Sequence, residues 1–225
     1  MPISHNVNDT LEKSSWIRKM FEEGLRMKQE HGAENVFDLS LGNPVVEPPE
    51  QVRQAIRSAA NDTTPGLHRY MPNAGLNDVR DAIAQSISVE SSVKLTADHI
   101  VMVCGAAGGL NITLKTLLDP GEEVIVFSPF FVEYPLYAEN HSGKTVIVPT
   151  HENFSLNFDT LREVLSPKTK AVIINSPNNP TGVIYPKKML EKLASILQQH
   201  TSNTGNQVYL ISDDPYKKIV FDGVE

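Results

Sequence analysis

A doubled asparagine, an aspartate and a tyrosine follow two apolar segments in the second half of the sequence. Asn179 comes after the apolar run Ala171–Ile174, and Asp213 and Tyr216 come after Val208–Ile211. A carboxylate can pair with a cationic ligand, whereas an amide and a phenol can hydrogen-bond a ligand oxygen. Simpler roles exist for the same residues, because Asn and Pro form turns and Asp commonly caps a helix or a turn.

A run of small residues and a group of aromatic residues follow two further apolar segments. Gly105–Gly109 has no bulk and opens a predicted helix, where backbone N–H groups and the helix dipole suit a phosphate. Close packing of the helix on a sheet explains the same glycines equally well. The aromatic group after Val124–Phe127 offers a stacking surface for a flat ring, although we expect two of its three members to be core: Phe130, Phe131 and Tyr134.

A parallel sheet would bring these segments together. Fully apolar β-branched runs alternate with helical stretches from residue 99 onward, and such a pattern favours a mostly parallel sheet with helices on both faces. Ligands of these α/β folds bind at the carboxyl ends of the strands. The expected strands are Ile100–Val103, Val124–Phe127, Thr145–Val148, Ala171–Ile174 and Val208–Ile211.

The N-terminal part has a different pattern. Periodic apolar residues predict a helix from about Asp9 to His31, a short helix after Pro48-Pro49, and another from Leu76 to Ile87. We therefore predict a helical N-terminal segment over residues 1–61 and an α/β domain over residues 62–225.

Composition limits the classes of protein and partner. The net charge of −7 argues against a nucleic-acid or anionic-membrane partner, since both require a basic face. The single cysteine, Cys104, excludes an intrachain disulfide and fits a reducing compartment. The sequence shows no leader peptide and no apolar run of ~18 residues, so we expect a cytoplasmic protein. Seven histidines without paired spacing make a metal site an unfavoured hypothesis.

Taken together, the motifs resemble those of the fold-type I pyridoxal-phosphate-dependent aminotransferases of class I/II, near the aspartate and aromatic aminotransferase group. The resemblance covers nearly the whole chain in the order of that family. The matching segments are Leu39–Pro44, Tyr70–Leu76, the glycine-rich helix start, Asp119–Val124, Ser128–Tyr134, Asn175–Gly182 and Ser212–Tyr216.

The resemblance implies pyridoxal 5'-phosphate as cofactor and an amino acid and a 2-oxo acid as substrates. Asp213 would pair with the pyridine nitrogen, and the protonated ring would then serve as an electron sink. Asn179 and Tyr216 would hydrogen-bond the phenolic oxygen of the ring, and Phe131 would stack on it. The backbone amides of Ala106 and Ala107 would hold the phosphate.

Two further roles follow from the resemblance. Tyr70 would reach the phosphate of the neighbouring subunit's cofactor, which implies a homodimer. Gly42, together with Asn179, would face the substrate. Residues 1–61 would contribute to the small domain of the family, and residues 62–225 would form an apparently truncated large domain.

The chain departs from the family pattern at the catalytic lysine. In the family, the lysine that forms a Schiff base with the cofactor follows the Asp-x-x-Tyr motif by some tens of residues. We therefore expect it beyond residue 225, and we expect this chain alone to be inactive, because Lys217 and Lys218 adjoin Tyr216 on the wrong side of the ring.

One alternative remains open, and a second is disfavoured by the sequence. The chain could be a non-catalytic cofactor-binding or regulatory fragment of the aminotransferase fold. A nicotinamide-dependent dehydrogenase is disfavoured, because the sequence lacks a GxGxxG motif followed by an acidic residue.

Overall fold

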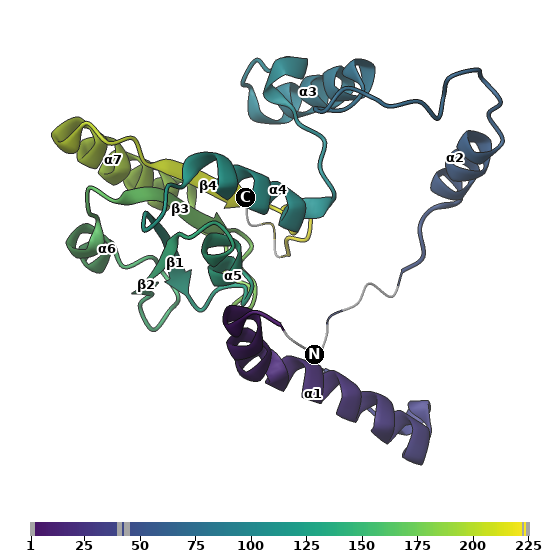
Figure 1. The fold of residues 1–225 in the computed structure, drawn as a ribbon, viewed down its shortest axis with the longest axis horizontal. Coiled ribbons are helices and arrows are strands. Elements are labelled where there is room, and N and C mark those ends of the chain that lie inside the picture. The colour runs from purple at the N-terminus through teal and green to yellow at the C-terminus, as the bar shows by residue number, and fades with distance from the viewer. Residues whose placement is uncertain (1–2, 40–41, 43–45, 222, 224–225) are drawn as a thin grey trace. The chain divides into compact units, whose positions relative to one another are not determined.

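The computed structural model describes residues 3–39, 42, 46–221 and 223, and of residues 5–6 and 9–18 it describes the backbone (Figure 1). The chain divides into two compact units, Met1–Tyr70 and Met71–Glu225. The domain boundary that the sequence predicts after residue 61 stays a prediction.

The first unit is helical. Helix α1 covers His5–His31, so the predicted helix is confirmed with an earlier start, where the Ser4 hydroxyl accepts a hydrogen bond from the backbone N–H of Val7 at 3.3 Å. A short 3-10 helix, η1, follows at Ala33–Asn35. Helix α2 covers Glu50–Ala60 and begins directly after Pro49, as the proline pair predicts.

The second unit contains a four-stranded, wholly parallel sheet. Its strands are β1 (Glu123–Ser128), β2 (Lys144–Pro149), β3 (Thr169–Asn175) and β4 (Tyr209–Asp213), in the spatial order β2-β1-β3-β4. The remaining elements are α3 (Asn77–Ser91), η2 (Ala97–His99), α4 (Gly105–Leu117), α5 (Tyr134–Glu139), α6 (Phe158–Val164) and α7 (Lys187–Thr204). Four of the predicted strands are therefore confirmed, with bounds that differ by one or two residues.

Alternate residues of the two central strands separate the core into two layers. On one face, Ile125 and Val172 pack with buried residues of α6 and α7, such as Leu161 and Leu193. On the other face, Val126 packs with buried residues of α4 and α5. Helices therefore cover both faces of the sheet, as the apolar strand pattern predicts, and Figure 1 shows them around the strands.

The predicted strand Ile100–Val103 is wrong. These residues have no strand pairing in the structure, and Val101, Met102 and Val103 are exposed. Their segment is anchored instead by a backbone hydrogen bond from Met102 N–H to the Ala74 carbonyl at 2.9 Å. An apolar β-branched run forms a strand only where a partner strand satisfies its backbone groups. Helix α4 nevertheless begins at Gly105, as predicted.

None of the helices that the structure describes is both long and apolar enough to cross a membrane.

Candidate functional site

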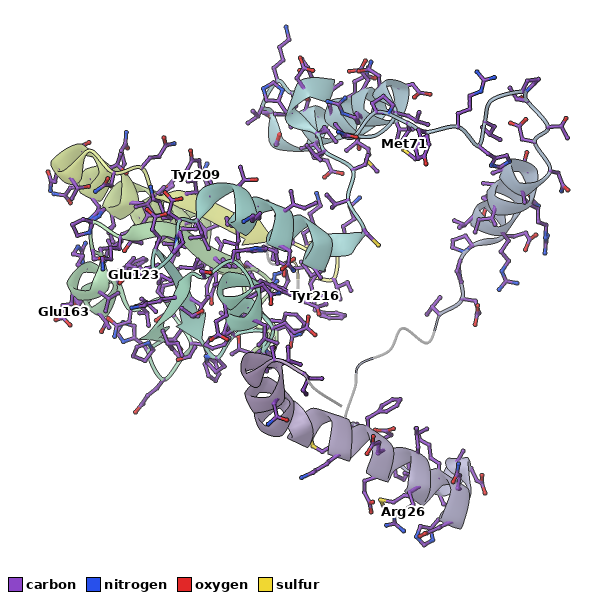
Figure 2. The ribbon with its side chains drawn as sticks, viewed as in Figure 1. Arg26, Met71, Glu123, Glu163, Tyr209 and Tyr216 are labelled. Carbon is purple, nitrogen blue, oxygen red and sulfur yellow. The ribbon has the colours of Figure 1, made fainter. Side chains whose placement is uncertain are left out.

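A cavity of about 240 Å³ lies at the carboxyl end of the sheet in the second unit. Four chain segments line it: the start of α4, the segment from β1 into α5, the end of β3 with its following loop, and the end of β4 with its following turn. The lining residues are Ala106, Ala107, Leu110, Phe131, Glu133, Tyr134, Tyr137, Asn175, Asn179, Asp213, Pro215 and Tyr216. Figure 2 labels Tyr209 at the start of β4 and Tyr216 beyond its end.

Asp213 is the last residue of β4, and its carboxylate is held by a phenol. The Tyr134 hydroxyl donates a hydrogen bond to Asp213 Oδ2 at 2.7 Å. Burial, and then the hydrogen bond and charge of Asp213, raise the pKa of the Tyr134 phenol well above its ordinary range. Tyr134 therefore remains a neutral hydrogen-bond donor to Asp213 at physiological pH.

The neighbouring carboxylate has a different environment. Asp214 is exposed and accepts a hydrogen bond from the Ser212 hydroxyl at 2.6 Å, whereas Asp213 is half-buried and lines the cavity. This difference agrees with the alternation expected along the strand end.

All three members of the aromatic group belong to or pack against the core layer of α4 and α5, and two of them, Phe131 and Tyr134, also line the cavity. Tyr134 is buried, and Phe131 is half-buried and lines the cavity. The two rings meet in a T-shaped arrangement, with centroids 5.6 Å apart and an interplanar angle of 73°. Phe130 packs against the core layer of α4 and α5. The contact with Tyr134 gives the Phe131 ring a defined orientation at the cavity wall.

An amide and a phenol from different loops converge on the cavity. The Asn179 side-chain amide donates to the Tyr216 hydroxyl at 3.4 Å, across 37 residues of sequence. The pair can offer N–H and O–H donors to one ligand oxygen, which is what the sequence predicts for these two residues.

The start of α4 provides the small-residue wall of the cavity. Gly105 has a φ of +70°, a conformation that glycine adopts without strain, and Ala106 and Ala107 line the cavity in the first turn. The first N–H groups of a helix lack partners within it, so this wall suits an anionic group.

Two predicted site residues belong to the first unit. Tyr70 is fully exposed there, and Gly42 is exposed with no atom within 4 Å of the position of an added Cβ. Of the motif over residues 39–44, Ser40, Leu41, Asn43 and Pro44 lie outside the described residues. The roles predicted for Tyr70 and Gly42 remain predictions.

Two residues that line the cavity make contacts that the sequence does not predict. The sequence predicts only a stacking or core role for Tyr134, and its hydrogen-bond partner Asp213 is 79 positions away. Asn175 ends β3 and is buried, yet its amide contacts both Asp213 and Asn179. Its position at the end of an apolar strand is a signal that could have singled out Asn175, because burying an amide is costly unless it is hydrogen-bonded.

Parallel α/β units bind their ligands at the carboxyl ends of the strands, which is where this cavity lies. The model of the family "Aminotransferase class I and II" matches residues 34–224. The chain belongs to the aminotransferase class I and II family.

Individual relatives agree with this assignment. The chain is 36% identical over 187 residues to a probable aspartate/prephenate aminotransferase of Thermus aquaticus, covering 82% of this chain and 46% of that protein. It is 34% identical over 224 residues to an aromatic-amino-acid aminotransferase of Thermococcus litoralis, covering 97% of this chain and 54% of that protein. The chain therefore spans about half the length of the curated relatives it matches.

Solved structures show the same architecture. An amino transferase from Eubacterium rectale superposes with a TM-score of 0.93 at 34% identity, over 100% of this chain and 57% of that one. The aspartate aminotransferase of Thermus thermophilus, determined with maleate, superposes with a TM-score of 0.83 at 32% identity, over 99% of this chain and 56% of that one. Aminotransferases of this family depend on pyridoxal 5'-phosphate.

The residues of the cavity fit this cofactor by their chemistry. A carboxylate suits a protonated ring nitrogen, an amide-phenol pair suits a ring oxygen, and a helix start suits a phosphate. Within the part of the chain that is described, no group of three or more His, Cys, Asp and Glu is arranged to hold a metal ion.

Proposed function

We propose that this chain forms the cofactor-binding part of a pyridoxal-phosphate-dependent aminotransferase that transfers an amino group between an amino acid and a 2-oxo acid. One observation carries the proposal: six residues singled out by sequence line one cavity, although they come from four separate segments. They are Ala106, Ala107, Phe131, Asn179, Asp213 and Tyr216.

Each residue has a proposed task. Asp213, held by Tyr134, pairs with the ring nitrogen and keeps it protonated. Asn179 and Tyr216 donate to the ring oxygen and stabilise its charged form. When bound, the cofactor supplies an electron sink for a substrate that has lost its α-proton.

The remaining cavity residues position the cofactor. Phe131 stacks on the ring, with its own orientation supported by the edge contact to Tyr134. The amides of Ala106 and Ala107 hold the phosphate at the start of α4. Gly42 is proposed to face the substrate together with Asn179.

Binding of pyridoxamine 5'-phosphate tests the proposal, because this amine form needs no covalent link to the protein. Titration calorimetry should show binding by the wild-type chain and affinity at least ~10-fold lower in Asp213→Asn, since a charge-assisted hydrogen bond contributes about 1.5–3 kcal/mol. Asp214→Asn is the matched control and should stay within about 2-fold. Equal loss in both variants, or no binding to the wild type, would contradict the proposed function.

Formation of a Schiff base with the cofactor is proposed to need a lysine that is not among the residues lining this cavity. Among the residues that the structure describes, none of those lining the cavity is a lysine, and Lys217 and Lys218 form ion pairs with Glu90 at 2.7 and 3.4 Å. Borohydride reduction of chain loaded with pyridoxal 5'-phosphate should therefore leave no single lysine labelled stoichiometrically, and the chain should not transaminate. A stoichiometric adduct at Lys217 or Lys218 with activity would refute this assignment.

That experiment also separates the two candidate roles. Cofactor binding without covalent chemistry is common to the N-terminal part of an enzyme and to a non-catalytic cofactor-binding or regulatory fragment. Recovery of transamination when a segment carrying the lysine is supplied would decide for the enzyme.

The proposal extends to assembly and location. Tyr70 is proposed to contact the phosphate in the neighbouring subunit of a homodimer, and its exposed ring is available for such a contact. Sedimentation should then show a dimer in the complete protein, and Tyr70→Phe should weaken cofactor binding. The single free cysteine, Cys104, supports a reducing location such as the cytoplasm.

A further inference from the structure

The buried amide of Asn175 connects the two segments that carry the ring-contacting residues. Its Nδ2 donates to the backbone carbonyl of Asp213 at 2.6 Å, and its Oδ1 accepts from the backbone N–H of Asn179 at 2.6 Å. The residue is 2% exposed and is the last residue of β3. Both ends of one planar amide are therefore used, one by each neighbouring segment.

The position in the sheet explains what these two bonds do. Asn175 and Asp213 form the last register pair between β3 and β4, where the regular ladder ends. The bond to the Asp213 carbonyl adds one cross-link beyond the ladder, and the bond to Asn179 N–H draws the loop after β3 back onto the strand end. The Asp213 carbonyl and the Asn179 N–H, which have no partner in the strand ladder, thus receive a buried hydrogen-bond partner.

We propose that Asn175 is a positioning residue that sets the spacing between Asp213 and Asn179, so that a pyridine nitrogen and a ring oxygen can be engaged at the same time. The inference rests on the proposed function and deepens it. The ring is rigid, so its two polar positions have a set separation, and the protein groups facing them must match that separation. A single amide that bonds both backbone segments is a direct means of doing so, because a shift of either segment stretches one of the two bonds.

The chemistry of the side chain makes asparagine necessary. One end must donate and the other must accept within a buried space, and an amide of this length does both. An ionised aspartate retains the acceptor for Asn179 N–H, but it places a carboxylate oxygen against the Asp213 carbonyl. A protonated aspartate restores a donor at that position, so its effect on the site should depend on pH.

The test compares Asn175→Asp with Asn178→Asp. Asn178 is also buried in the same loop, but its Oδ1 accepts only local hydrogen bonds from Thr181, at 2.9 and 3.3 Å, which an aspartate can also accept. Both variants replace a buried amide by a carboxyl group, at positions three residues apart. The affinity for pyridoxamine 5'-phosphate, relative to wild type at each pH, is measured by calorimetry from pH 5.5 to 8.5.

We expect Asn175→Asp to bind ~10-fold more weakly than wild type at pH 8.5 and to regain most of that loss at pH 5.5. Burial raises the pKa of a carboxyl group, so protonation of the new side chain falls within this interval. Asn178→Asp should stay within about 2-fold of wild type throughout. A similar loss in both variants, or a loss in Asn175→Asp that does not vary with pH, overturns the inference.

A measurement without ligand separates this inference from the proposed function. In Asn175→Leu, which is similar in size and lacks both polar atoms, exchange of the Asn179 amide hydrogen, followed by NMR, should accelerate at least ~10-fold relative to wild type. If Asn175→Leu does not fold, the pH profile of Asn175→Asp decides alone. Wild-type chain that protects the Asn179 amide but does not bind the ligand would contradict the proposed function, whereas an unprotected amide would contradict the link through Asn175.

Discussion

The hydrogen bond from Tyr134 to Asp213 joins two side chains that line the cavity. It joins the first turn of α5 to the end of β4, and it occupies one carboxylate oxygen with a donor that does not ionise at neutral pH. Tyr137 has a raised pKa too, because it is buried and donates to Glu133. These neutral phenols line the same cavity as the two carboxylates to which they donate.

Replacing Tyr134 with phenylalanine should lower the free energy of unfolding by about 1–2 kcal/mol at neutral pH, because a half-buried carboxylate loses its donor. The difference from wild type should shrink above pH about 10, where the phenol ionises in the unfolded chain but not in the folded one. Because the pKa of Tyr134 is higher in the folded chain than in the unfolded one, its contribution to stability is fully present below the pKa of the unfolded chain. That contribution is lost as the pH rises toward the pKa of the folded chain.

Urea unfolding followed by circular dichroism from pH 7 to 11 measures both effects. Tyr185→Phe is the matched control, since burial alone raises the pKa of that phenol, and it should change neutral-pH stability by less than about 0.5 kcal/mol. A gap between wild type and Tyr134→Phe that widens with pH would show that the bond to Asp213 is not the cause.

At the scale of the elements, local sequence patterns predict the strands and helices. They do not predict the long-range hydrogen bonds that connect these elements. The apolar runs of β1 and β3 are buried on both faces, so their strand pattern is unambiguous. Val101–Val103 has the same composition but no ladder, since pairing depends on a partner and not on the run itself. Asn175 and Tyr134 act across chain distances of 38 and 79 residues, which no local pattern encodes.

The turn between α5 and β2 depends on a glycine packed against its neighbours. A Cβ on Gly143 would lie 2.7 Å from Leu118 Cδ1 and 3.1 Å from the Ala138 carbonyl oxygen. Gly143→Ala should therefore lower the free energy of unfolding by about 1–3 kcal/mol through overpacking.

Gly108→Ala is the control for this prediction. Gly108 lies inside α4, and the nearest atom to an added Cβ is Cys104 Cβ at 3.8 Å, an ordinary contact. Helix propensity then favours alanine by up to about 1 kcal/mol. Thermal unfolding of the two variants should shift in opposite directions, and a stabilised Gly143→Ala would contradict the packing argument.

At the scale of the whole molecule, the cavity is formed within one of the two compact units. Every residue that lines the cavity lies in Met71–Glu225, as do both core layers of the sheet. The predicted boundary after residue 61 stays a prediction, because residues 62–70 are rich in turn formers and have no periodic apolar pattern that would mark a domain start.

Residues 71–225 expressed alone should fold and unfold in one cooperative transition. The reason is that the sheet carries a buried core layer on each of its two faces, and both layers lie within this unit. Coincident urea transitions in far-ultraviolet and near-ultraviolet circular dichroism measure the cooperativity. A fragment that keeps its helical signal but gives no near-ultraviolet signal would contradict the expectation.

The spatial order of the strands has a consequence for how the protein is made. The strand order is β2-β1-β3-β4, so β1 and β2 are synthesised first and can pair with each other. Strand β3 then pairs with the other edge of β1, and only after that can β4 pair with β3. Asp213 arrives with β4, so no shorter nascent chain contains a finished cavity. A ligand of this cavity stabilises only the completed sheet, by mass action. Supply of the ligand would then govern how many newly made chains persist against degradation.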